Sequence, residues 1–345
     1  MKKSIYVVAI ICLMVSMLSG FSFFCPNNSF SSANQETKGL VAFSQSGMEN
    51  EWRAMNTKEM ESAVRAAGYD FVWTNANGDP GQQLSDVESL LAQKPVLLII
   101  SPLEYEALAP VPEMCEKADV PLIVIDRALK GEPKTGKYIV LLTTDFVDTG
   151  RLVAEDVVAD LTAKNGSPKG KLLHIAGTKG ASPVIDEEKG LMEVFEKYPD
   201  IEIVATCDGQ YSREPGRKCT EDLLQAFPAG SIDGIIYDSD DMAIGGLQAI
   251  KAAGREELKG YIYGKDGTID GLEAMIDGWM SFTVQTPPFF GAKAMEIWEK
   301  YLKGEDIGDP IQYVPKECFD NDTPEQIERL KERIKELEEM GVGCC

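Results

Sequence analysis

The sequence predicts an α/β fold made of two doubly wound parallel-sheet domains, and three observations support this prediction. Short β-rich runs alternate with helical patterns from Gly39 onward, an order typical of parallel sheets with right-handed crossovers. The helical patterns repeat apolar residues at spacings of three and four. The β-rich runs are too numerous for one comfortable sheet, and the loop at 129–140, with its glycines, lysines and proline, is a natural break between two domains.

The β-rich runs consist mostly of β-branched, aromatic and other apolar residues, which suit buried strands. In chain order they are LVAFS (40–44), DFVWT (70–74), VLLIIS (96–101), PLIVID (121–126), YIVLLTT (138–144), KLLHIAG (171–177), IEIVATC (201–207), IDGIIYD (232–238), GYIYGKD (260–266) and SFTVQT (281–286). The segments between them favour helices, and the clearest are QQLSDVESLLAQ (82–93), TGRLVAEDVVADLTAK (149–164), KGLMEVFEKYP (189–199) and DMAIGGLQAIKAAG (241–254). This order predicts repeated β-α-β units.

The segment at 323–339 predicts a terminal amphipathic helix. Thr323 can cap it, Pro324 fits its first turn, and Gln326 completes a capping box. One apolar stripe follows, formed by Ile327, Leu330, Ile334 and Leu337. We expect this stripe to pack against the helix's own domain, with self-association through the same stripe as the alternative.

The first residues predict a secretory signal peptide. Two lysines precede a long apolar run, and the small residues SSA at 31–33 follow it. We expect cleavage after Ala33, which removes residues 1–33 and places the chain in the periplasm or on the extracytoplasmic face. Lipid modification of Cys25 is an alternative, although two phenylalanines precede it where such signals place a small residue. An uncleaved anchor is another, because the run is nearly long enough to span a bilayer.

Charge and composition exclude several classes of function. The formal net charge is −22, and because residues 1–33 carry two lysines and no acid, the mature chain has a net charge of −24. Such a charge repels nucleic acid and anionic lipid. His174 is the one histidine in the sequence, so histidine-rich metal sites are excluded, and we expect no metal and no cofactor. A packed or strand-end role for His174 is favoured over a Ser-His-Asp triad, since no G-x-S-x-G elbow accompanies it.

Polar and aromatic side chains stand where the first strand turns into the first helix. Gln45 ends the strand, and Trp52 and Arg53 follow closely. Open α/β sheets bind ligands at the carboxyl ends of their strands, so these three residues are candidates to face a ligand. A capped helix with a surface tryptophan is the alternative.

Seven stretches carry a family resemblance: FSQSGMENEWRAM (43–55), NGDPGQQLSDVESLLAQKPVLLIISP (77–102), PLIVIDRAL (121–129), GTKGASPVIDEEKGL (177–191), SDDMAIGGLQAIKAAG (239–254), GKDGTIDG (264–271) and VQTPPFFGAKA (284–294). Together they resemble the bacterial periplasmic sugar-binding proteins of the ribose-binding type, and the first, fourth and fifth are most similar to the galactofuranose-binding members. The resemblance implies two Rossmann-like lobes joined by three crossovers, a periplasmic binding protein fold of type I. The implied lobes are 39–144 with 286–313, and 145–285 with 314–345.

The resemblance also implies a sugar site between the lobes. The positions that match the family's ligand-contacting residues are Gln45, Trp52, Arg53, Asp126, Arg127, Tyr211, Asp266 and Gln285. Carboxylates and guanidinium groups can each form two hydrogen bonds to hydroxyls, while an aromatic ring covers the apolar face of a sugar. Alternatives remain: Asp126 ends a strand, Asp266 precedes a turn glycine and Tyr211 suits ordinary packing. The paired acids at 240–241 are favoured as helix-start residues rather than ligand contacts.

The chain departs from the family pattern at two site positions. Glu187, which follows Asp186, stands where many relatives have an arginine, and Ser239 stands where they have an asparagine. We include all three residues in the expected ligand site. An acid in place of a cation changes which hydroxyl pattern or ligand charge is tolerated, and Lys265 is a candidate to rebalance that charge.

Two of the eight cysteines are expected to form a disulfide. Cys207 ends a strand and Cys219 lies on the helix that follows, so both belong to one βα unit, and an exported chain is oxidised. Cys115, Cys318 and the two terminal cysteines at 344–345 have no partner that the sequence identifies.

The leading functional hypothesis is a monomeric solute receptor that captures a monosaccharide, galactofuranose or a related aldose, for an ABC permease. A sensor that presents bound sugar to a membrane receptor is the alternative. An enzyme is disfavoured because no phosphate loop, G-x-G-x-x-G fingerprint or metal cluster is present in the sequence. A sugar-responsive transcription factor shares the fold by resemblance, but a signal peptide occupies the place of its DNA-binding headpiece.

Overall fold

Each predicted β-rich run forms a strand in the computed structural model, which describes residues 37–133 and 137–340. These strands are β1 (Leu40–Gln45), β2 (Asp70–Asn75), β3 (Leu97–Ser101), β4 (Leu122–Asp126), β5 (Tyr138–Thr143), β6 (Gly170–Ala176), β7 (Ile201–Asp208), β8 (Gly234–Tyr237), β9 (Ile262–Asp266) and β10 (Phe282–Gln285). Two short strands were not predicted, β11 (Ile311–Tyr313) and β12 (Cys318–Asp320). The predicted signal peptide, its cleavage site and Cys25 lie outside the described residues.

Helices connect the strands as the alternating pattern predicts. They are α1 (Glu51–Ala66), α2 (Pro80–Ala92), α3 (Val111–Ala118), α4 (Phe146–Asn165), α5 (Ser182–Phe195), α6 (Arg213–Ala226), α7 (Asp240–Ala252), α8 (Ile269–Ile276), α9 (Gly291–Lys303) and α10 (Pro324–Glu339), with a short 3₁₀ turn at Glu256–Leu258. Several begin at side-chain caps of the kind that helix starts favour. Asn50 accepts from the amide of Arg53 at the start of α1, and Asp79 accepts from Gly81 and Gln82 at the start of α2.

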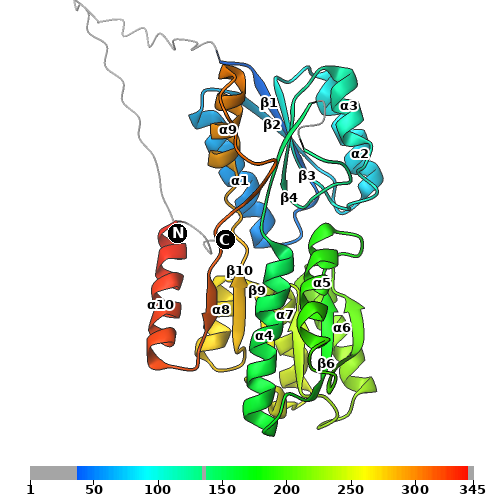
Figure 1. Cartoon of the computed structure of the whole chain (residues 1–345), viewed down its shortest axis with the longest axis vertical. Coiled ribbons are helices and arrows are strands. Elements are labelled where there is room, and N and C mark those ends of the chain that lie inside the picture. The colour runs from blue at the N-terminus through cyan, green and yellow to red at the C-terminus, as the bar shows by residue number, and fades with distance from the viewer. Residues whose placement is uncertain (1–36, 134–136, 341–345) are drawn as a thin grey trace, which may run out of the picture. The chain divides into compact units, whose positions relative to one another are not determined.

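The strands form two six-stranded sheets, which confirms the predicted fold of two doubly wound lobes (Figure 1). Lobe 1 has the order β11-β5-β4-β3-β1-β2, and lobe 2 has the order β12-β10-β9-β8-β6-β7. All neighbours pair in parallel except β10 and β12, which are antiparallel. In the described part of the chain, the lobes are joined between β5 and α4, between β10 and α9, and between β11 and β12.

The prediction that the loop at 129–140 divides the two domains is wrong. The strands that flank this loop, β4 and β5, are hydrogen-bonded neighbours in the lobe 1 sheet. A glycine- and lysine-rich connection is also what a surface loop between two adjacent strands requires. The chain passes to lobe 2 one strand later, after Thr143.

Alternation along the strands explains why each sheet has helices on both faces. In β1, Val41 and Phe43 belong to a core shared with α1 and α9, whereas Ala42 belongs to a core shared with α2 and α3. Successive side chains of a strand point to opposite faces, so a strand that is apolar throughout needs cover on both sides. Figure 1 shows α1 and α9 on one side of this sheet and α2 and α3 on the other.

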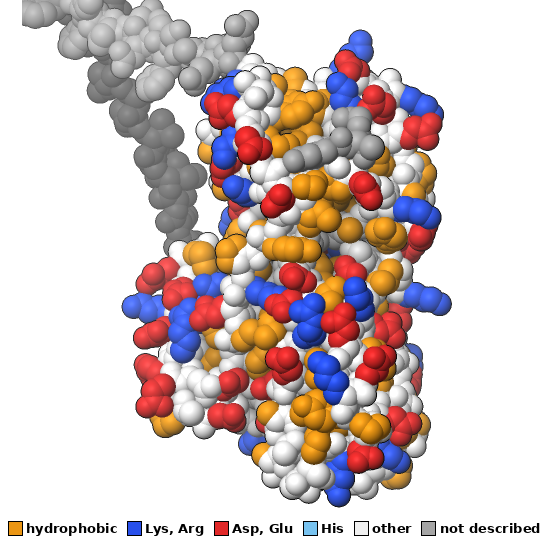
Figure 2. Space-filling model, viewed as in Figure 1, with side chains coloured by type: hydrophobic (Ala, Val, Ile, Leu, Met, Phe, Trp, Pro, Cys, Tyr) orange, Lys and Arg blue, Asp and Glu red, His pale blue; other side chains and the backbone are white. Residues whose placement is uncertain are grey.

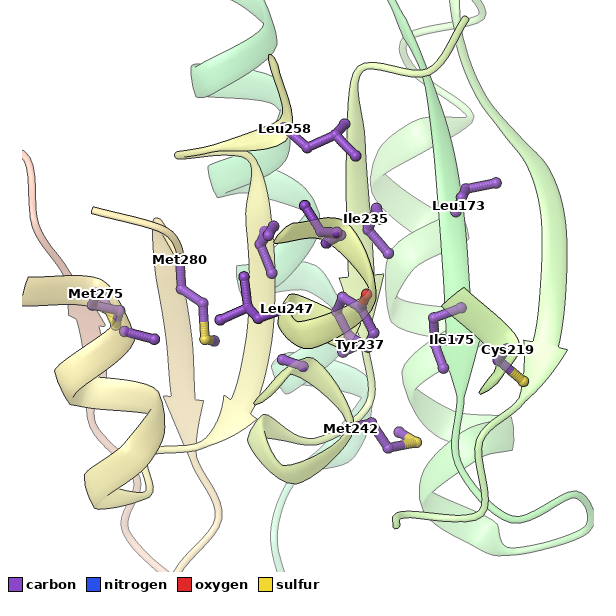
Figure 3. Packing of buried hydrophobic residues seen from close by; sticks show 14 of the residues in the cluster. Leu173, Ile175, Cys219, Ile235, Tyr237, Met242, Leu247, Leu258, Met275 and Met280 are labelled. Atoms are coloured by element: carbon purple, nitrogen blue, oxygen red, sulfur yellow. The ribbon is translucent and has the colours of Figure 1, made fainter. Parts of the chain in front are cut away.

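Lobe 2 is built in the same way. On β6, Leu172 packs into the core beneath α4 and α5, while Leu173 and Ile175 pack into the opposite core beneath α6 and α7. Figure 3 shows this second core, in which Leu173, Ile175, Ile235, Tyr237, Met242, Leu247 and Leu258 lie between strands and helices. These rigid sheets fix the positions of the strand ends.

The C-terminal helix packs on its own lobe, as predicted. Thr323 and Gln326 form the capping box, and Leu330 and Leu337 are buried in the lobe 2 core against α8. Ile334 is partly buried beside them. The apolar stripe of α10 is therefore used mainly within the chain.

Charged side chains of both signs are interspersed over the face of the molecule in Figure 2. Many form ion pairs, such as Arg329 with Glu317 at 2.8 Å. Within residues 37–133 and 137–340, no helix is both long and apolar enough to cross a membrane. In the same residues, no cluster of His, Cys, Asp or Glu side chains is arranged to hold a metal ion.

Candidate functional site

A cavity lies between the two lobes, at the carboxyl ends of the strands. Its lining residues stand at or just after strand ends or within the first two turns of helices, where open α/β sheets place their ligand sites. They are Asn50, Trp52, Arg53, Asp126, Arg127, Phe146, Pro183, Glu187, Tyr211, Asp238, Asp266 and Thr286. Both lobes contribute, so we call the two halves the lobe 1 wall and the lobe 2 wall.

Two arginines and two carboxylates form a balanced network on the lobe 1 wall. Arg53, on the first turn of α1, donates from Nη1 to Asp126 Oδ2 at 2.7 Å and to Ser101 Oγ at 2.9 Å. The Arg127 Nε atom lies 3.8 Å from the same Asp126 oxygen. Glu49 Oε1 lies 3.4 Å from Arg53 Nε and 3.8 Å from Arg127 Nη2.

This network keeps its groups charged although they are buried. Burial opposes the charge of Arg53, but Asp126 and Glu49 outweigh it and raise the pKa of this guanidinium. Burial likewise opposes the charge of Glu49, and the two arginines overcome it and lower the pKa of this carboxyl. Burial, followed by the nearby charge of Arg53, lowers the pKa of Arg127. The wall therefore offers fixed donors and acceptors at neutral pH.

Aromatic rings stand beside both arginines. The Arg53 guanidinium lies 4.7 Å from the ring centroid of Trp52, and the Arg127 guanidinium lies 5.1 Å from that of Tyr211. Tyr211 lies so close to Gly177 that a Cβ there would come within 2.0 Å of the ring. The buried Tyr211 hydroxyl has no hydrogen-bond partner among the described residues, so it is available to a ligand in the cavity.

The lobe 2 wall contains a buried chain of charged groups. Lys265 Nζ makes a very short contact with Glu187 Oε2 and donates to Asp238 Oδ1 at 2.7 Å. The same Asp238 oxygen lies 2.8 Å from His174 Nε2, and its second oxygen accepts from the amide of Gly177 at 2.9 Å. His174 is thus a strand residue that holds a cavity carboxylate, and this agrees with the favoured prediction for it.

The pKa values of the lobe 2 wall carboxyls shift in different directions. Burial raises the pKa of Glu187 above its ordinary value, although the ion pair with Lys265 opposes this shift. Burial also acts on Asp238, but Lys265 and His174 outweigh it and hold the pKa of Asp238 well below its usual range. Burial, and next the charge of Asp240, raise the pKa of Asp266 far above its ordinary value. This wall therefore holds one carboxylate whose charge two cationic or hydrogen-bonding partners stabilise, Asp238, beside two carboxyls whose charge burial disfavours.

Three of the lining residues have left-handed backbone conformations. Asp126 has φ of 62°, Tyr211 of 55° and Asp266 of 111°. Such conformations are costly for residues other than glycine, and they persist where surrounding contacts hold them. Thr143 Oγ1 donates to the carbonyl oxygen of Asp126 at 2.5 Å, and Thr286 Oγ1 donates a very short bond to the Asp266 carboxyl. Each strained turn directs its carboxylate into the cavity.

Direct hydrogen bonds connect the lobes around the cavity. Asn50 Nδ2 donates to the carbonyl oxygen of Tyr211 at 3.0 Å, and the amide of Ala128 donates to Ser182 Oγ at 2.7 Å. Arg127 is only 2% exposed. The two lobes are therefore closed over the cavity, which shields its polar groups from water.

Seven of the predicted ligand residues line this cavity. They are Trp52, Arg53, Asp126, Arg127, Glu187, Tyr211 and Asp266. They come from segments up to about 200 positions apart in the sequence. The fold brings them together at the ends of β4 and β9 and near the starts of α1, α5 and α6. Because Glu187 is 2% exposed, it faces the cavity and not solvent.

Four predicted residues do not line the cavity. The Gln45 amide donates to Asn56 Oδ1 at 2.9 Å and Thr57 Oγ1 at 3.1 Å, so it fixes α1 to the end of β1. Ser239 caps α7 by accepting from the amide of Met242 at 3.2 Å. Short polar side chains at such junctions bond to the local backbone or the next helix before they can reach a ligand.

Asp186 and Gln285 border neighbouring pockets. Asp186 lies on the side of α5 that faces Asp145 and Tyr313, and Gln285 faces a pocket between α1 and α10. On a helix, adjacent positions differ by about 100° in direction, so Glu187 and Asp186 cannot face the same cavity. The structure thus assigns the pair of adjacent acids to different surroundings.

Some lining residues were not predicted. Asp238 ends the run IDGIIYD and Thr286 ends SFTVQT, so a strand-end rule applied to every polar residue would have found both. Asn50, Phe146 and Pro183 carry no such signal, because helix caps and first-turn residues of these types are common. Lys265 lies behind the lining.

Other predicted features can now be placed. Cys207 and Cys219 form the predicted disulfide, with Cα atoms 5.8 Å apart. Cys115 is a buried free thiol and Cys318 an exposed one. The acid at 240 starts α7, as predicted, and its carboxylate also accepts from the amide of Thr268 at 2.8 Å, so it links α7 to the loop after β9.

Comparisons with known proteins agree with this architecture. The periplasmic binding protein domain model matches residues 41–306. The chain is 30% identical over 303 residues to the galactofuranose-binding protein of Escherichia coli K12, covering 87% of this chain and 92% of that protein. A Mycobacterium smegmatis protein solved in complex with β-D-fucofuranose is 31% identical, with a TM-score of 0.78, and the match covers 87% of this chain and 96% of that one. The periplasmic binding protein of the arabinose ABC transporter from Shewanella sp. ANA-3, bound to α- and β-L-arabinofuranose, is 28% identical with a TM-score of 0.76, over 87% of this chain and 98% of that one.

Proposed function

Because the chain belongs to the periplasmic binding protein family, we propose that it is a receptor for a monosaccharide, galactofuranose or a related aldose, which it delivers to an ABC permease. The sugar would bind in the cavity between the lobes, with Trp52, Arg53, Asp126, Arg127, Glu187, Tyr211 and Asp266 as contacts. The proposal assigns no chemical reaction to the chain.

The observation that carries this proposal is the combination of groups in one shielded cavity. Buried arginines and carboxylates supply paired donors and acceptors, and such groups match sugar hydroxyls, each of which donates and accepts. Trp52 and Tyr211 supply aromatic surface for the C–H face of a sugar ring.

A five-membered ring is the ring form that the comparisons favour. The similar proteins named above are described with galactofuranose, fucofuranose and arabinofuranose. The identities are about 30%, and Glu187, which lines the cavity, departs from the family pattern. We therefore extend only the ring form and the neutral aldose class to this chain.

Closure of the lobes would couple binding to transport. Contacts that exist only in the closed arrangement, such as Asn50 to Tyr211 and Ala128 to Ser182, are stabilised when a ligand touches both walls. A permease that recognises the closed arrangement would then distinguish the loaded receptor. Stimulation of the ATPase of a permease encoded beside this chain by receptor plus sugar tests this step, and activation of a receptor kinase instead would favour a sensor.

The ligand itself is tested with a thermal-shift screen of aldoses in both ring forms, followed by calorimetry on the hits. We expect one sugar per chain at micromolar affinity or tighter, about −8 kcal/mol. Sugar acids should bind more weakly, because an added carboxylate would meet Glu187 and Asp238 in a shielded cavity. Silence across the panel from folded, ligand-free protein would overturn the proposed function.

A further inference from the structure

The charges of the two walls are balanced differently. On the lobe 1 wall, Arg53 and Arg127 face Glu49 and Asp126. On the lobe 2 wall, three carboxylates gather at the cavity, those of Glu187, Asp238 and Asp266. Among the described residues, Lys265 is the one lysine or arginine within ion-pair distance of any of these three.

Lys265 acts from behind the cavity. Its side chain is 2% exposed and does not belong to the lining, whereas its two partners do. The ammonium lies between Glu187 Oε2 and Asp238 Oδ1. It therefore fixes the positions of two carboxyls that face the cavity and neutralises part of their charge.

The position is unusual for a lysine. Lys265 is the fourth of five residues in β9, a buried strand whose other members are apolar, glycine or the cavity acid Asp266. A buried ammonium is costly unless it is paired, and here the pairing with Asp238 and Glu187 overcomes burial and raises the pKa of Lys265. Glu187 stands where the family resemblance places an arginine, and in this chain the lysine beside these carboxyls comes from β9 instead.

We propose that Lys265 is a positioning residue that determines specificity: by neutralising Glu187 and Asp238, it makes the lobe 2 wall suitable for an uncharged sugar and excludes cationic amino sugars. This inference rests on the proposed function. Without Lys265, the wall would hold carboxylates with no lysine or arginine beside them, and a ligand ammonium would replace the missing charge.

The test measures selectivity in addition to affinity. Calorimetry compares the aldose that binds the parent best with its 2-amino-2-deoxy analogue, for the parent and for Lys265→Met. Removal of the cation should weaken binding of the neutral sugar by roughly tenfold or more, because two buried carboxylates lose their shared partner. The ratio of amino-sugar affinity to neutral-sugar affinity should rise by roughly tenfold, since the ammonium now meets uncompensated carboxylates.

A double variant and a surface control separate charge from damage. Lys265→Met combined with Glu187→Gln removes the charge pair together, and it should recover much of the neutral-sugar affinity and lose the gain for the amino sugar. Lys218→Met alters an exposed lysine paired with Asp222. It should change neither the neutral-sugar affinity nor the ratio of amino-sugar affinity to neutral-sugar affinity. If Lys265→Met does not fold, the double variant alone tests the role of Lys265. It should still bind the neutral sugar, with the parent's ratio of amino-sugar affinity to neutral-sugar affinity.

The possible failures are distinguishable. A parent that binds no aldose removes the proposed function, and this inference falls with it. A parent that binds normally, with an unchanged selectivity ratio in Lys265→Met, overturns only the role of Lys265. The role of Lys265 is also overturned if the double variant binds the neutral sugar no more tightly than Lys265→Met does. The loss of affinity would then come from lost packing and not from charge.

Discussion

The lobe 1 wall and the lobe 2 wall both place charged groups at the ends of buried strands, yet they stabilise those charges by different means. On the lobe 1 wall, Arg53 and Asp126 form a direct ion pair at 2.7 Å, and both are nearly inaccessible. On the lobe 2 wall, Asp266 has a threonine hydroxyl as its hydrogen-bond donor. Burial raises the pKa of Asp266 far above its ordinary value, so its charge is disfavoured.

Two aspartates at equivalent strand ends can therefore have different roles. Asp126 and Asp266 both end a parallel strand and both have positive φ. The guanidinium beside Asp126 makes it a structural partner as well as a proposed ligand contact, whereas Asp266 has a neutral hydroxyl as its donor. Replacement of each by its neutral isostere should therefore have unequal consequences.

The largest effect is expected for Asp126→Asn compared with Asp266→Asn. Asp126→Asn leaves Arg53 buried without its strongest partner, and we expect sugar binding to weaken by about 3 kcal/mol, with a loss of unfolding free energy as well. Asp266→Asn alters a carboxyl whose donor is a threonine hydroxyl, so it should cost about 1 kcal/mol of binding and little stability. Asparagine tolerates positive φ, so backbone strain is the same in both. If the two variants lose the same binding free energy in calorimetry and the same unfolding free energy in urea, the proposed difference between the walls is contradicted.

The disulfide of lobe 2 should contribute nearly as much to stability. Cys207 and Cys219 close a short loop around the turn that carries Tyr211, and cross-linking a loop of this size is worth about 3 kcal/mol in the chain-entropy model. We expect the double variant Cys207→Ser with Cys219→Ser to unfold at lower urea concentration and to bind sugar less well. Cys318→Ser, at an exposed free thiol, is the control. It should change neither the urea concentration of unfolding nor the sugar affinity. Coincident unfolding curves for parent and double variant would refute this contribution.

A smaller effect is expected where the two walls meet at Tyr211. Its hydroxyl has no partner within residues 37–133 and 137–340, so Tyr211→Phe should leave the unfolding free energy unchanged and weaken sugar binding by about 1 kcal/mol. Tyr237→Phe gives the opposite pattern, because that buried hydroxyl bonds to Thr220 Oγ1 at 2.9 Å. Calorimetry that shows the same affinity for Tyr211→Phe and the parent would mean that this hydroxyl does not reach the ligand.

The smallest effect is a dependence of stability on pH. Burial, and next the charges of Asp160, Asp320 and Asp322, raise the pKa of Asp156 in lobe 2 from 3.8 to about 8. The folded chain then keeps a proton that the unfolded chain releases, so this group's contribution to stability is full below pH 3.8 and is lost as the pH rises to about 8. Asp156→Asn should reduce the fall in unfolding free energy between about pH 7.5 and pH 9 by less than about 1 kcal/mol. The exposed Asp222→Asn is the control, and an undiminished fall in Asp156→Asn would show that another group is responsible.

Much of the fold could be predicted from the sequence because its strands are long and buried on both faces. Runs such as VLLIIS and YIVLLTT have no other stable arrangement once helices alternate with them. The strands β11 and β12 have three residues each, which is too short for an alternating apolar pattern to be recognised. They form because the edge strands β5 and β10 offer free backbone groups to pair with. The misplaced domain break at 129–140 shows that loop composition identifies a surface connection but not which elements it joins.

The site could be predicted less completely, because side-chain direction depends on tertiary contacts. Asp126 and Arg127, which the resemblance singled out, stand at the end of β4 and line the cavity. Gln45 and Ser239 stand at equivalent junctions, but nearer partners on α1 and α7 satisfy them. The partnership of Lys265 with Glu187 joins positions 78 apart, and the sequence indicated Lys265 only as a candidate to rebalance the charge of Glu187.

The most direct test of the central claim is a crystal structure of the mature chain with the aldose that binds best. We predict that the sugar ring lies in the cavity between the lobes, with its hydroxyls hydrogen-bonded to Asp126 and Arg127 on one wall and to Glu187 or Asp266 on the other. A sugar bound elsewhere, or one in contact with a single lobe, would contradict it.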